Sequence, residues 1–259
     1  EVEAYKVRIR NHKKAMYIRT AFFVVILVLA VLLAKYLIDH HRYRSYKVVT
    51  KKEKTDNVSE YEYADGKILR YSSDGAALLK TNLDAIWNVT FTMGMPSVDV
   101  CGATSAIYDK RGTSVCIYNE KGSIGSFNTD KPILFGRVSE QGNFAAVLED
   151  GETTWINYYS KSGTEIATIS TNLSSPGYPA SICLSHDGLF LAVSYFTAGG
   201  GAPGTHLVFY NFGNAGRDKT DNEVATEDFP GTLIPEVEYL SNTEAVAFRD
   251  NGFTVYKGS

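Results

Sequence analysis

The sequence SHDGLFLAVSYF (residues 185–196) aligns with SEQGNFAAVLED (residues 139–150) at an offset of 46 residues. In both stretches a Ser and a Gly, three positions apart, precede an alternation of apolar side chains. That pattern is typical of a tight turn followed by a strand. The pair therefore predicts a repeated unit of about 46 residues, and repeats of this length are typical of stacked architectures.

A second marker recurs at a similar interval along the chain. Strands that end in Tyr are followed by polar turns, and these tyrosines are spaced by 47, 41, 51 and 46 residues: Tyr71, Tyr118, Tyr159, Tyr210 and Tyr256. The best-preserved unit reads as four short strands, PASICLS, LFLAVSYF, THLVFYNF and NEVATEDF. Four strands in about 45 residues is the spacing of a β-propeller blade.

The fold class that follows is all-β. We expect a β-propeller with about five four-stranded blades, preceded by one transmembrane α-helix. The blade-like units fall at roughly 46–83, 86–130, 131–172, 178–228 and 232–259. Because the last unit is short and the chain begins with Glu, we expect these blades to be part of a larger propeller. A β-sandwich is the less favoured alternative, since it leaves the regular Tyr spacing unexplained.

An apolar segment, AFFVVILVLAVLLAKYLI, occupies residues 21–38. It is uninterrupted from Ala21 to Ala34, and a bilayer core needs about 20 helical residues. Residues 20–38 meet this length if Lys35 extends its ammonium to the headgroups. A buried core helix is seldom apolar all round, and no small-residue cleavage site follows as in a signal peptide. We therefore expect a membrane anchor at residues 20–38.

Charge divides the chain into two parts. Residues 1–54 contain 13 Lys and Arg against 4 Asp and Glu, whereas residues 55–259 contain 13 against 25. A basic arm beside an apolar span is typical of membrane-flanking sequence. The acidic remainder argues against nucleic-acid binding, which needs a positive surface.

The orientation in the membrane rests on the short basic tail. Lys and Arg lie on both sides of the span in similar numbers, so their distribution alone does not decide which side faces the cytosol. A short basic tail before a first span usually stays in the cytosol, so we expect the domain outside the plasma membrane. The organisation that follows is a basic cytoplasmic tail (1–19), the span (20–38), a basic juxtamembrane linker with a candidate first strand (39–56), and a propeller domain cut short at its C-terminal end (57–259).

Two passages carry a resemblance to a known family. They are SYKVVTKKEKTDNVSEYEYADGKILRYSSDGAALLKTNLDAIWNVTF (45–91) and MPSVDVCGATSAIYDKRGTSVCIYNEKGSIGSF (95–127). The stretch GYPASICLSHDGLFLAVSY (177–195) adds to it, and VDVCG and VFYNFGNAGRDKTDN (208–222) are its most specific parts. With the basic tail and the span, the chain resembles the bacterial proteins grouped as domain of unknown function 5711, found mainly in Gram-positive bacteria. The resemblance implies a single-pass membrane protein with an extracytoplasmic propeller-like domain. It implies no activity, so it transfers no catalytic residue.

A wider similarity is to WD40-like and quinoprotein-type blades. The stretch DGKILRYSSDGAALLKTNLDAIW (65–87) resembles the quinoprotein type, in which a Gly turn precedes a strand and a Trp that packs between blades. No basic or paired-Cys cluster suited to a quinone is present, so we expect no cofactor.

The Ser, His and Asp that begin the opening stretch have the composition of a hydrolase triad. Adjacent residues point in different directions, whereas a triad needs converging side chains. The aligned unit keeps Ser139 and Gly142 but lacks the His and the Asp. We therefore interpret Ser185–Gly188 as a tight turn and expect no catalytic residue.

Metal and disulfide chemistry have little support in the sequence. His186 and His206 are the only histidines of the domain, and neither has a partner at ligand spacing, so we expect no metal site. Cys101, Cys116 and Cys183 lie in β-like apolar runs and are interpreted as small buried side chains. The sequence leaves open whether Cys101 and Cys116, on neighbouring strands, form a disulfide.

Propellers often bind partners with the loops at one end of their blades. In four such loops (86–96, 172–179, 196–205 and 213–231) we single out Trp87, Met93, Tyr178, Phe196 and Phe229 as binding candidates. For Trp87 and Tyr178, simple packing between blades is the stronger interpretation.

Two functions from different classes remain. The first is a membrane-tethered extracytoplasmic binding or scaffold module for a protein or a cell-envelope component. The alternative is an envelope enzyme, a hydrolase or a quinone-type oxidoreductase, with its site in the axial channel. Asp, Glu, Arg or His side chains from several blades around one axial pocket would favour the enzyme.

Overall fold

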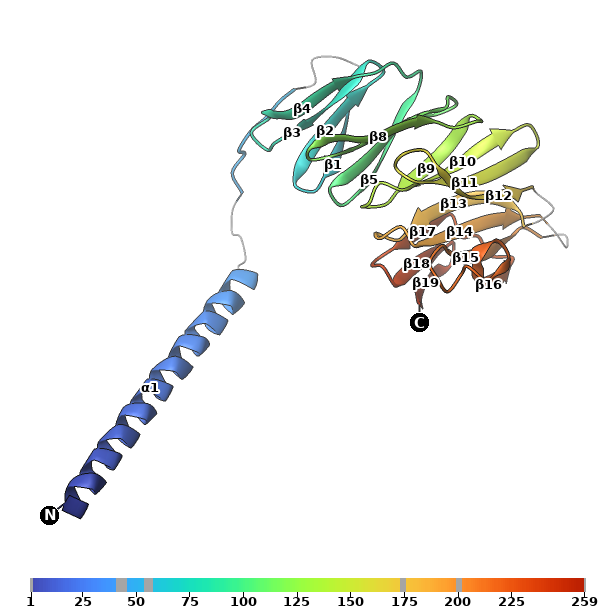
Figure 1. Ribbon diagram of the computed structural model, residues 1–259. Helices are drawn as coiled ribbons and strands as arrows, with labels where there is room; N and C mark the ends of the chain where they lie inside the picture. Colours follow the sequence, from blue (N-terminus) through green and yellow to red (C-terminus); the bar gives the residue numbers. More distant parts are fainter. Residues whose placement is uncertain (1, 41–45, 54–57, 173–175, 199–201, 259) are drawn as a thin grey trace. The chain divides into compact units, whose positions relative to one another are not determined.

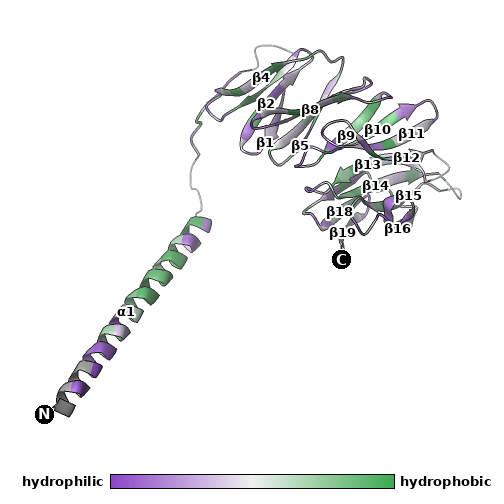
Figure 2. Ribbon diagram, viewed as in Figure 1, coloured by the Kyte–Doolittle hydropathy of each residue, from purple (hydrophilic) through white to green (hydrophobic). Residues whose placement is uncertain are grey.

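The N-terminal segment contains no Gly or Pro from residue 2 to residue 39, so nothing interrupts a helix there. In the computed structural model it forms one helix, α1 (Val2–Asp39). Its part from Arg10 to Asp39 is long and apolar enough to cross a membrane. Figure 2 shows a hydrophilic first part and a hydrophobic second part of this helix. The structure describes residues 2–40, 46–53, 58–172, 176–198 and 202–258.

The chain divides into two compact units, Glu1–Val49 and Thr50–Ser259. In the described residues of the second unit, the strands form five antiparallel sheets in chain order, four of them with four strands and the last with three (Figure 1). A short 3-10 helix, η2 (Thr220–Asn222), precedes the last strand of the fourth sheet.

The strands have the following bounds. Sheet 1 contains β1 (Glu60–Ala64), β2 (Lys67–Ser72), β3 (Gly75–Leu79) and β4 (Ala85–Thr90). Sheet 2 contains β5 (Pro96–Cys101), β6 (Thr104–Asp109), β7 (Ser114–Asn119) and β8 (Gly122–Asn128). Sheet 3 contains β9 (Ile133–Val138), β10 (Phe144–Asp150), β11 (Thr153–Tyr159) and β12 (Glu165–Thr171). Sheet 4 contains β13 (Tyr178–Leu184), β14 (Phe190–Thr197), β15 (Gly204–Asn211) and β16 (Glu223–Pro230). Sheet 5 contains β17 (Glu236–Tyr239), β18 (Glu244–Arg249) and β19 (Gly252–Lys257).

The first strands of successive sheets lie next to one another. Contacts join β1 to β5, β5 to β9, β9 to β13 and β13 to β17, so these five inner strands run along a common axis (Figure 1). Each sheet then extends outward through its later strands, which is the arrangement of propeller blades. The predicted all-β propeller with one N-terminal helix is therefore confirmed.

Sheet 4 is covered on both faces, which explains its continuous apolar strands. On β14, Val193 belongs to the core cluster shared with sheet 3, whereas its neighbour Ala192 belongs to the cluster shared with sheet 5. Consecutive strand residues point to opposite faces of the sheet. A strand that contributes to a core cluster on each face therefore needs apolar residues at consecutive positions. The stretch LFLAVSY (residues 189–195) is apolar at most positions for this reason.

The turn before β14 has the predicted form. Ser185 Oγ donates to Asp187 Oδ1 at 2.7 Å, and the Phe190 amide donates to Ser185 Oγ at 2.9 Å. Gly188 has a φ of +69°. The His186 imidazole places Nδ1 3.7 Å from Glu140 Oε1, in the turn that follows β9 of sheet 3. The turn interpretation is confirmed, and the three residues form no triad.

The first unit boundary was predicted wrongly. The strand that contains Trp87 closes sheet 1, whereas the sequence placed it at the start of the second unit. The reason is the Tyr marker: Tyr118, Tyr159, Tyr210 and Tyr256 lie on third strands, but Tyr71 lies on the second strand of its sheet. Residues 46–53, part of the predicted candidate first strand, have no secondary structure, and the rest of that linker lies largely outside the described residues.

Candidate functional site

Charged side chains of different inner strands meet near the axis. Arg137 on β9 places Nη1 3.2 Å from Asp99 Oδ1 on β5 and Nη2 3.6 Å from Glu238 Oε1 on β17. The Cys183 thiol on β13 donates to Glu238 Oε2 at 3.3 Å. We call Asp99, Arg137, Cys183 and Glu238 the inner-strand cluster. Its members come from four successive sheets, so it ties these sheets together.

Local alternation on β5 explains where the carboxylate of Asp99 points. Val98 and Val100 pack against the core cluster between sheets 1 and 2. Because neighbours on a strand point to opposite faces, Asp99 is directed to the other side, toward sheet 3. There its Oδ2 accepts a hydrogen bond of 2.6 Å from the Val138 amide.

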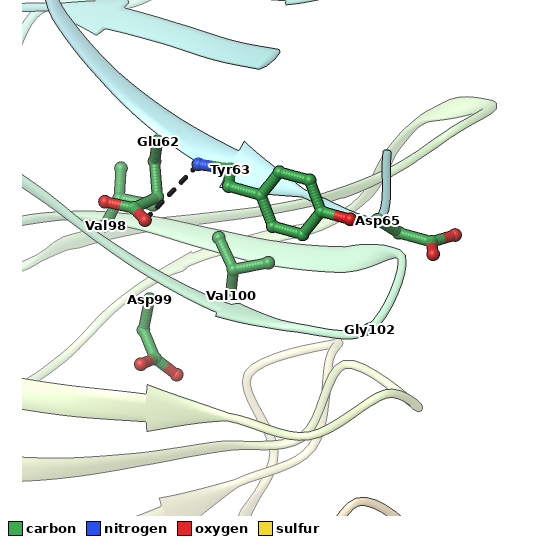
Figure 3. A pocket seen from close by; sticks show the side chains of 7 residues that line it. All are labelled: Glu62, Tyr63, Asp65, Val98, Asp99, Val100 and Gly102. Atoms are coloured by element: carbon green, nitrogen blue, oxygen red, sulfur yellow. Dashed lines mark hydrogen bonds between the residues drawn. The ribbon is translucent and has the colours of Figure 1, made fainter. Parts of the chain in front are cut away.

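Two cavities lie at the C-terminal ends of the inner strands. One, of about 500 Å³, is lined by Glu62, Tyr63, Asp65, Val98, Asp99, Val100 and Gly102 (Figure 3). The other, of about 160 Å³, is lined by the inner-strand cluster together with Cys101, His186 and five neighbours. Asp99, Val100 and Gly102 line both cavities, so the two adjoin.

The larger cavity has an acidic and aromatic lining. Figure 3 shows the side chains of Glu62, Tyr63 and Asp65, from the end of β1 and the following turn, above the β5 residues. The Tyr63 side chain is 70% exposed, and Glu62 and Asp65 are exposed as well. Among the described residues that line this cavity there is no Lys, Arg or His. Carboxylates beside an accessible aromatic ring form an environment that attracts cations.

The environment of the cluster shifts its titrating groups. Burial raises the pKa of Asp99, an effect that Arg137 and the Val138 amide oppose. Burial raises the pKa of Cys101 to about 11, and burial and the Glu238 carboxylate raise the pKa of Cys183 well above its ordinary range. Both cysteines are therefore neutral thiols near pH 7, whereas nucleophilic catalysis needs a thiolate.

The arrangement includes the feature that would favour an enzyme. Asp99, Arg137, His186 and Glu238, from several blades, line one cavity. The Arg137 guanidinium, however, faces two carboxylates inside the protein, and the thiols that line the same cavity are protonated. The smaller cavity therefore brings polar side chains of several blades together, as a catalytic site does, but neither of the two cysteines that line it is an activated nucleophile.

Two of the residues predicted to bind lie between sheets 1 and 2. The Trp87 ring stacks on Tyr118 with centroids 5.0 Å apart, and its Nε1 donates to the Asn119 carbonyl at 2.8 Å. Met93 is only 3% exposed and belongs to the same core cluster. Trp87 thus packs between blades.

The other three predicted residues lie across sheet 4. Tyr178 is opposite Phe196, and Phe196 and Phe229 are both opposite Thr205 on the strand between them. Tyr178 is 43% exposed, and both Phe side chains are half-buried. Tyr178 begins β13, whereas the cavity-lining Leu184 ends it, so this row lies at the opposite end of the blade from the cavities.

The charged residues of the smaller cavity are not among those predicted from the sequence. Asp99, Arg137 and Glu238 each stand inside the first strand of a repeat, in VDV, GRV and VEY. A charged residue in a strand whose neighbours are mostly apolar is the signal that could have identified them. The predicted binding residues were instead chosen from the loops between strands.

The structure also describes the state of the cysteines and the grouping of potential metal ligands. Cys101, Cys116 and Cys183 are free thiols, so Cys101 and Cys116 form no disulfide. Within the described ranges, no group of three or more His, Cys, Asp or Glu has the arrangement of a metal site.

Comparisons with solved structures support the fold. The complex of KlAtg21 with the coiled-coil of AgAtg16 matches at a TM-score of 0.57 with 12% identity, covering 82% of this chain and 71% of that chain. Hsv2 from Kluyvelomyces marxianus matches at 0.53 with 13% identity, covering 82% and 75%.

None of the curated proteins matches the chain. The sequence model of a family of unknown function, DUF5711, matches residues 39–259. This match covers every sheet described above and confirms the resemblance seen in the sequence. The chain therefore belongs to the DUF5711 family.

Proposed function

We propose that this protein is a membrane-anchored binding module whose propeller holds a cationic group of a protein or cell-envelope partner. The site is the larger cavity, at the ends of β1 and β5. The observation that carries the proposal is its lining: the exposed carboxylates of Glu62 and Asp65 occur with the exposed ring of Tyr63, with no basic side chain among the described lining residues. An ammonium or guanidinium group placed there would meet carboxylates and a π-face together.

Charge on a larger scale supports the same partner chemistry. Residues 55–259 contain 25 Asp and Glu against 13 Lys and Arg. A net negative domain attracts cations from a distance and speeds their encounter with an acidic site. The attraction weakens as salt is added, which gives the proposal a simple first test.

An envelope enzyme is the second candidate, and one observation favours it. Polar side chains of several sheets line the smaller cavity, as expected of an axial catalytic site. Binding ranks first because Arg137 is already paired with Asp99 and Glu238. Turnover of an envelope substrate by the purified full chain, lost in Arg137→Gln, would reverse this ranking.

The proposed orientation places the basic tail in the cytosol and the propeller outside. It is supported by the apolar part of α1 and by the short basic sequence before it. In a Cys101→Ser/Cys116→Ser/Cys183→Ser background, we expect a membrane-impermeant maleimide to label Thr81→Cys on intact cells and to label Lys6→Cys only after permeabilisation. The opposite pattern would place the domain in the cytosol.

A second contact area is proposed at the other end of sheet 4. Tyr178 and Phe196 are neighbours on paired strands, and Tyr178 remains partly exposed. Aromatic side chains of this kind are frequent anchors of protein interfaces. A partner that contacted both areas would lose affinity in Tyr178→Ala as well as in cavity variants.

The decisive experiment measures binding of a Lys-rich decapeptide to the purified full chain. We expect Glu62→Gln/Asp65→Asn to weaken binding by about tenfold or more, since two charges leave the site. Glu149→Gln/Glu152→Gln removes two exposed carboxylates, one near the end of β10 and one in the turn that follows it. It is the matched control and should bind as the native protein does. Equal loss in both variants would show a response to net charge alone and would contradict the site.

Cross-linking in intact cells then identifies the natural partner. The full-length protein and the Glu62→Gln/Asp65→Asn variant are compared. A partner captured by the first and not by the second supports the proposal. Capture that does not change in the variant contradicts it.

A further inference from the structure

Helix α1 continues well beyond the apolar segment toward its N-terminus. It begins at Val2, about five turns before the apolar run. Figure 2 shows this first part as predominantly hydrophilic. Because the helix is continuous, the side chains of the first part keep a fixed rotation relative to the apolar part.

Four basic side chains of this extension lie on one face. Lys6, Arg10, Lys13 and Lys14 follow the spacing i, i+4, i+7 and i+8, which places them within an arc of about 100°. All four are exposed. Tyr17, also exposed, falls on the same arc between these residues and the apolar run. We call these four basic residues the basic stripe.

Three of the four stripe residues have no acidic neighbour at helical spacing on α1. No Asp or Glu occurs between Glu3 and Asp39, and Glu3 stands three residues before Lys6 alone. The positive charge of Arg10, Lys13 and Lys14 is therefore uncompensated along α1, because an Asp or Glu three or four residues away would be needed to neutralise it.

Distance along the helix brings most of the stripe to the membrane surface. With a rise of about 1.5 Å per residue, Lys14 lies about 9 Å and Arg10 about 15 Å before Thr20. The headgroup layer is about 5–7 Å thick, and the potential of an anionic surface extends about 8–10 Å further at physiological salt. Lys13, Lys14 and Arg10 thus lie within this range, whereas Lys6, about 21 Å before Thr20, lies beyond it.

We propose that the basic stripe of α1 binds the headgroups of anionic phospholipids and fixes how the helix sits in the bilayer. The inference rests on the proposed membrane crossing by α1 and needs no partner of the propeller. A lipid surface is the partner that fits, because the stripe is continuous with the segment that would lie in the bilayer. Juxtamembrane clusters of four or more basic residues attract acidic lipids additively.

The test uses the full chain reconstituted into phosphatidylcholine vesicles. Flotation of the vesicles first checks the membrane anchor by itself. Spin-labelled phosphatidylglycerol and spin-labelled phosphatidylcholine are then compared for association with the protein. We expect phosphatidylglycerol to be preferred by about threefold or more at low salt, and the preference to shrink in 0.5 M NaCl, as electrostatic binding requires.

Variants separate the stripe from net charge. Arg10→Gln/Lys13→Gln/Lys14→Gln should remove more than half of the preference while flotation stays unchanged. Lys47→Gln/Lys51→Gln/Lys52→Gln removes the same charge from the other side of the span and should keep the preference. No preference in the native chain, or equal loss in the two variants, would overturn the stripe. A protein that does not float would instead contradict the proposed anchor.

Discussion

Gly188 shows how one residue of the opening stretch joins two blades. Its carbonyl oxygen accepts a hydrogen bond from the Tyr158 hydroxyl of sheet 3. A Cβ added at this position would lie 2.9 Å from Ser139 Oγ and 3.0 Å from Tyr158 Oη. The glycine is thus required twice, for its left-handed backbone and for the close approach of the neighbouring sheet.

The first prediction compares two glycines with similar backbone angles. Gly188 has a φ of +69° and Gly151 a φ of +65°, but nothing lies within 4 Å of a Cβ at Gly151. Gly151→Ala should therefore cost only the strain of the left-handed region, about 1 kcal/mol. Gly188→Ala should cost about 1–3 kcal/mol more, because it also forces sheets 3 and 4 apart.

Denaturant unfolding of the two variants measures this difference. The midpoint should fall further for Gly188→Ala, with the denaturant dependence unchanged. Equal midpoints would contradict the prediction, because they would show that a Cβ at Gly188 fits beside Ser139 and Tyr158 without moving the sheets.

The second prediction concerns the thiol of Cys101. Burial raises its pKa to about 11, so the thiolate fraction at a given pH is lower than for an ordinary thiol. In a Cys116→Ser/Cys183→Ser background, alkylation by iodoacetamide at pH 8 should be about a hundredfold slower than for a free thiol. The rate should rise about tenfold per pH unit until it levels near the raised pKa. Mass spectrometry of the alkylated peptide follows the rate, and a plateau near pH 9 would contradict the shift.

At the scale of residues, the residues that form tight turns could be predicted from the sequence, whereas the ion-pair partners of charged side chains could not. Ser185 and Gly188 were interpreted as turn residues because local spacing alone specifies such a turn. Arg137 carries no local sign that it will face Asp99, 38 positions earlier, and Glu238 much later in the chain. Such pairs depend on which strands become neighbours.

At the scale of elements, β14 demonstrates burial from two sides. Leu191 at its start is fully buried, whereas Leu189 in the preceding turn is 45% exposed. The strand can be apolar at nearly every position because sheets 3 and 5 cover its two faces.

The third prediction uses these two leucines as a matched pair. Leu191→Ala should lower the free energy of unfolding by about 2–5 kcal/mol, through lost burial and the cavity that remains. Leu189→Ala, the same chemical change two residues earlier, should change it by about 0.5 kcal/mol or less. Thermal unfolding of both variants decides, and similar losses would show that β14 is not the buried strand.

Element boundaries were predicted less well than element types. The unit containing Tyr71 was placed one strand early because its tyrosine lies on a second strand, whereas the other four markers lie on third strands. One side chain cannot reveal its strand number, because second and third strands of a blade share the same apolar alternation. Trp87 was consequently assigned to a loop between units and lies instead on β4.

At the scale of the whole molecule, the inner-strand cluster links four sheets near the axis. Removal of the central guanidinium would leave Asp99 and Glu238 facing each other without their cation. The Arg137 side chain is 33% exposed, so water offsets part of the effect. The cost is therefore smaller than for a fully buried ion pair.

The fourth prediction follows from this geometry. Arg137→Gln should lower the free energy of unfolding by about 1–3 kcal/mol, and Arg217→Gln, at an exposed loop position, by about 0.5 kcal/mol or less. Asp99→Asn in the Arg137→Gln background should recover part of the loss, since it removes the uncompensated carboxylate. Additive effects of the two substitutions would show that they do not interact.

The sequence by itself determined what depends on short range: a strongly apolar segment, a repeat of turns and strands, and hence an all-β propeller behind one helix. Period-two alternation and turn chemistry are local properties, so they can be read from consecutive residues. Only the tertiary structure decided that Asp99, Arg137, Cys183 and Glu238 meet, and that Glu62, Tyr63 and Asp65 line an adjoining cavity together with Asp99. These residues belong to five different sheets, and the packing of inner strands along one axis brings them together.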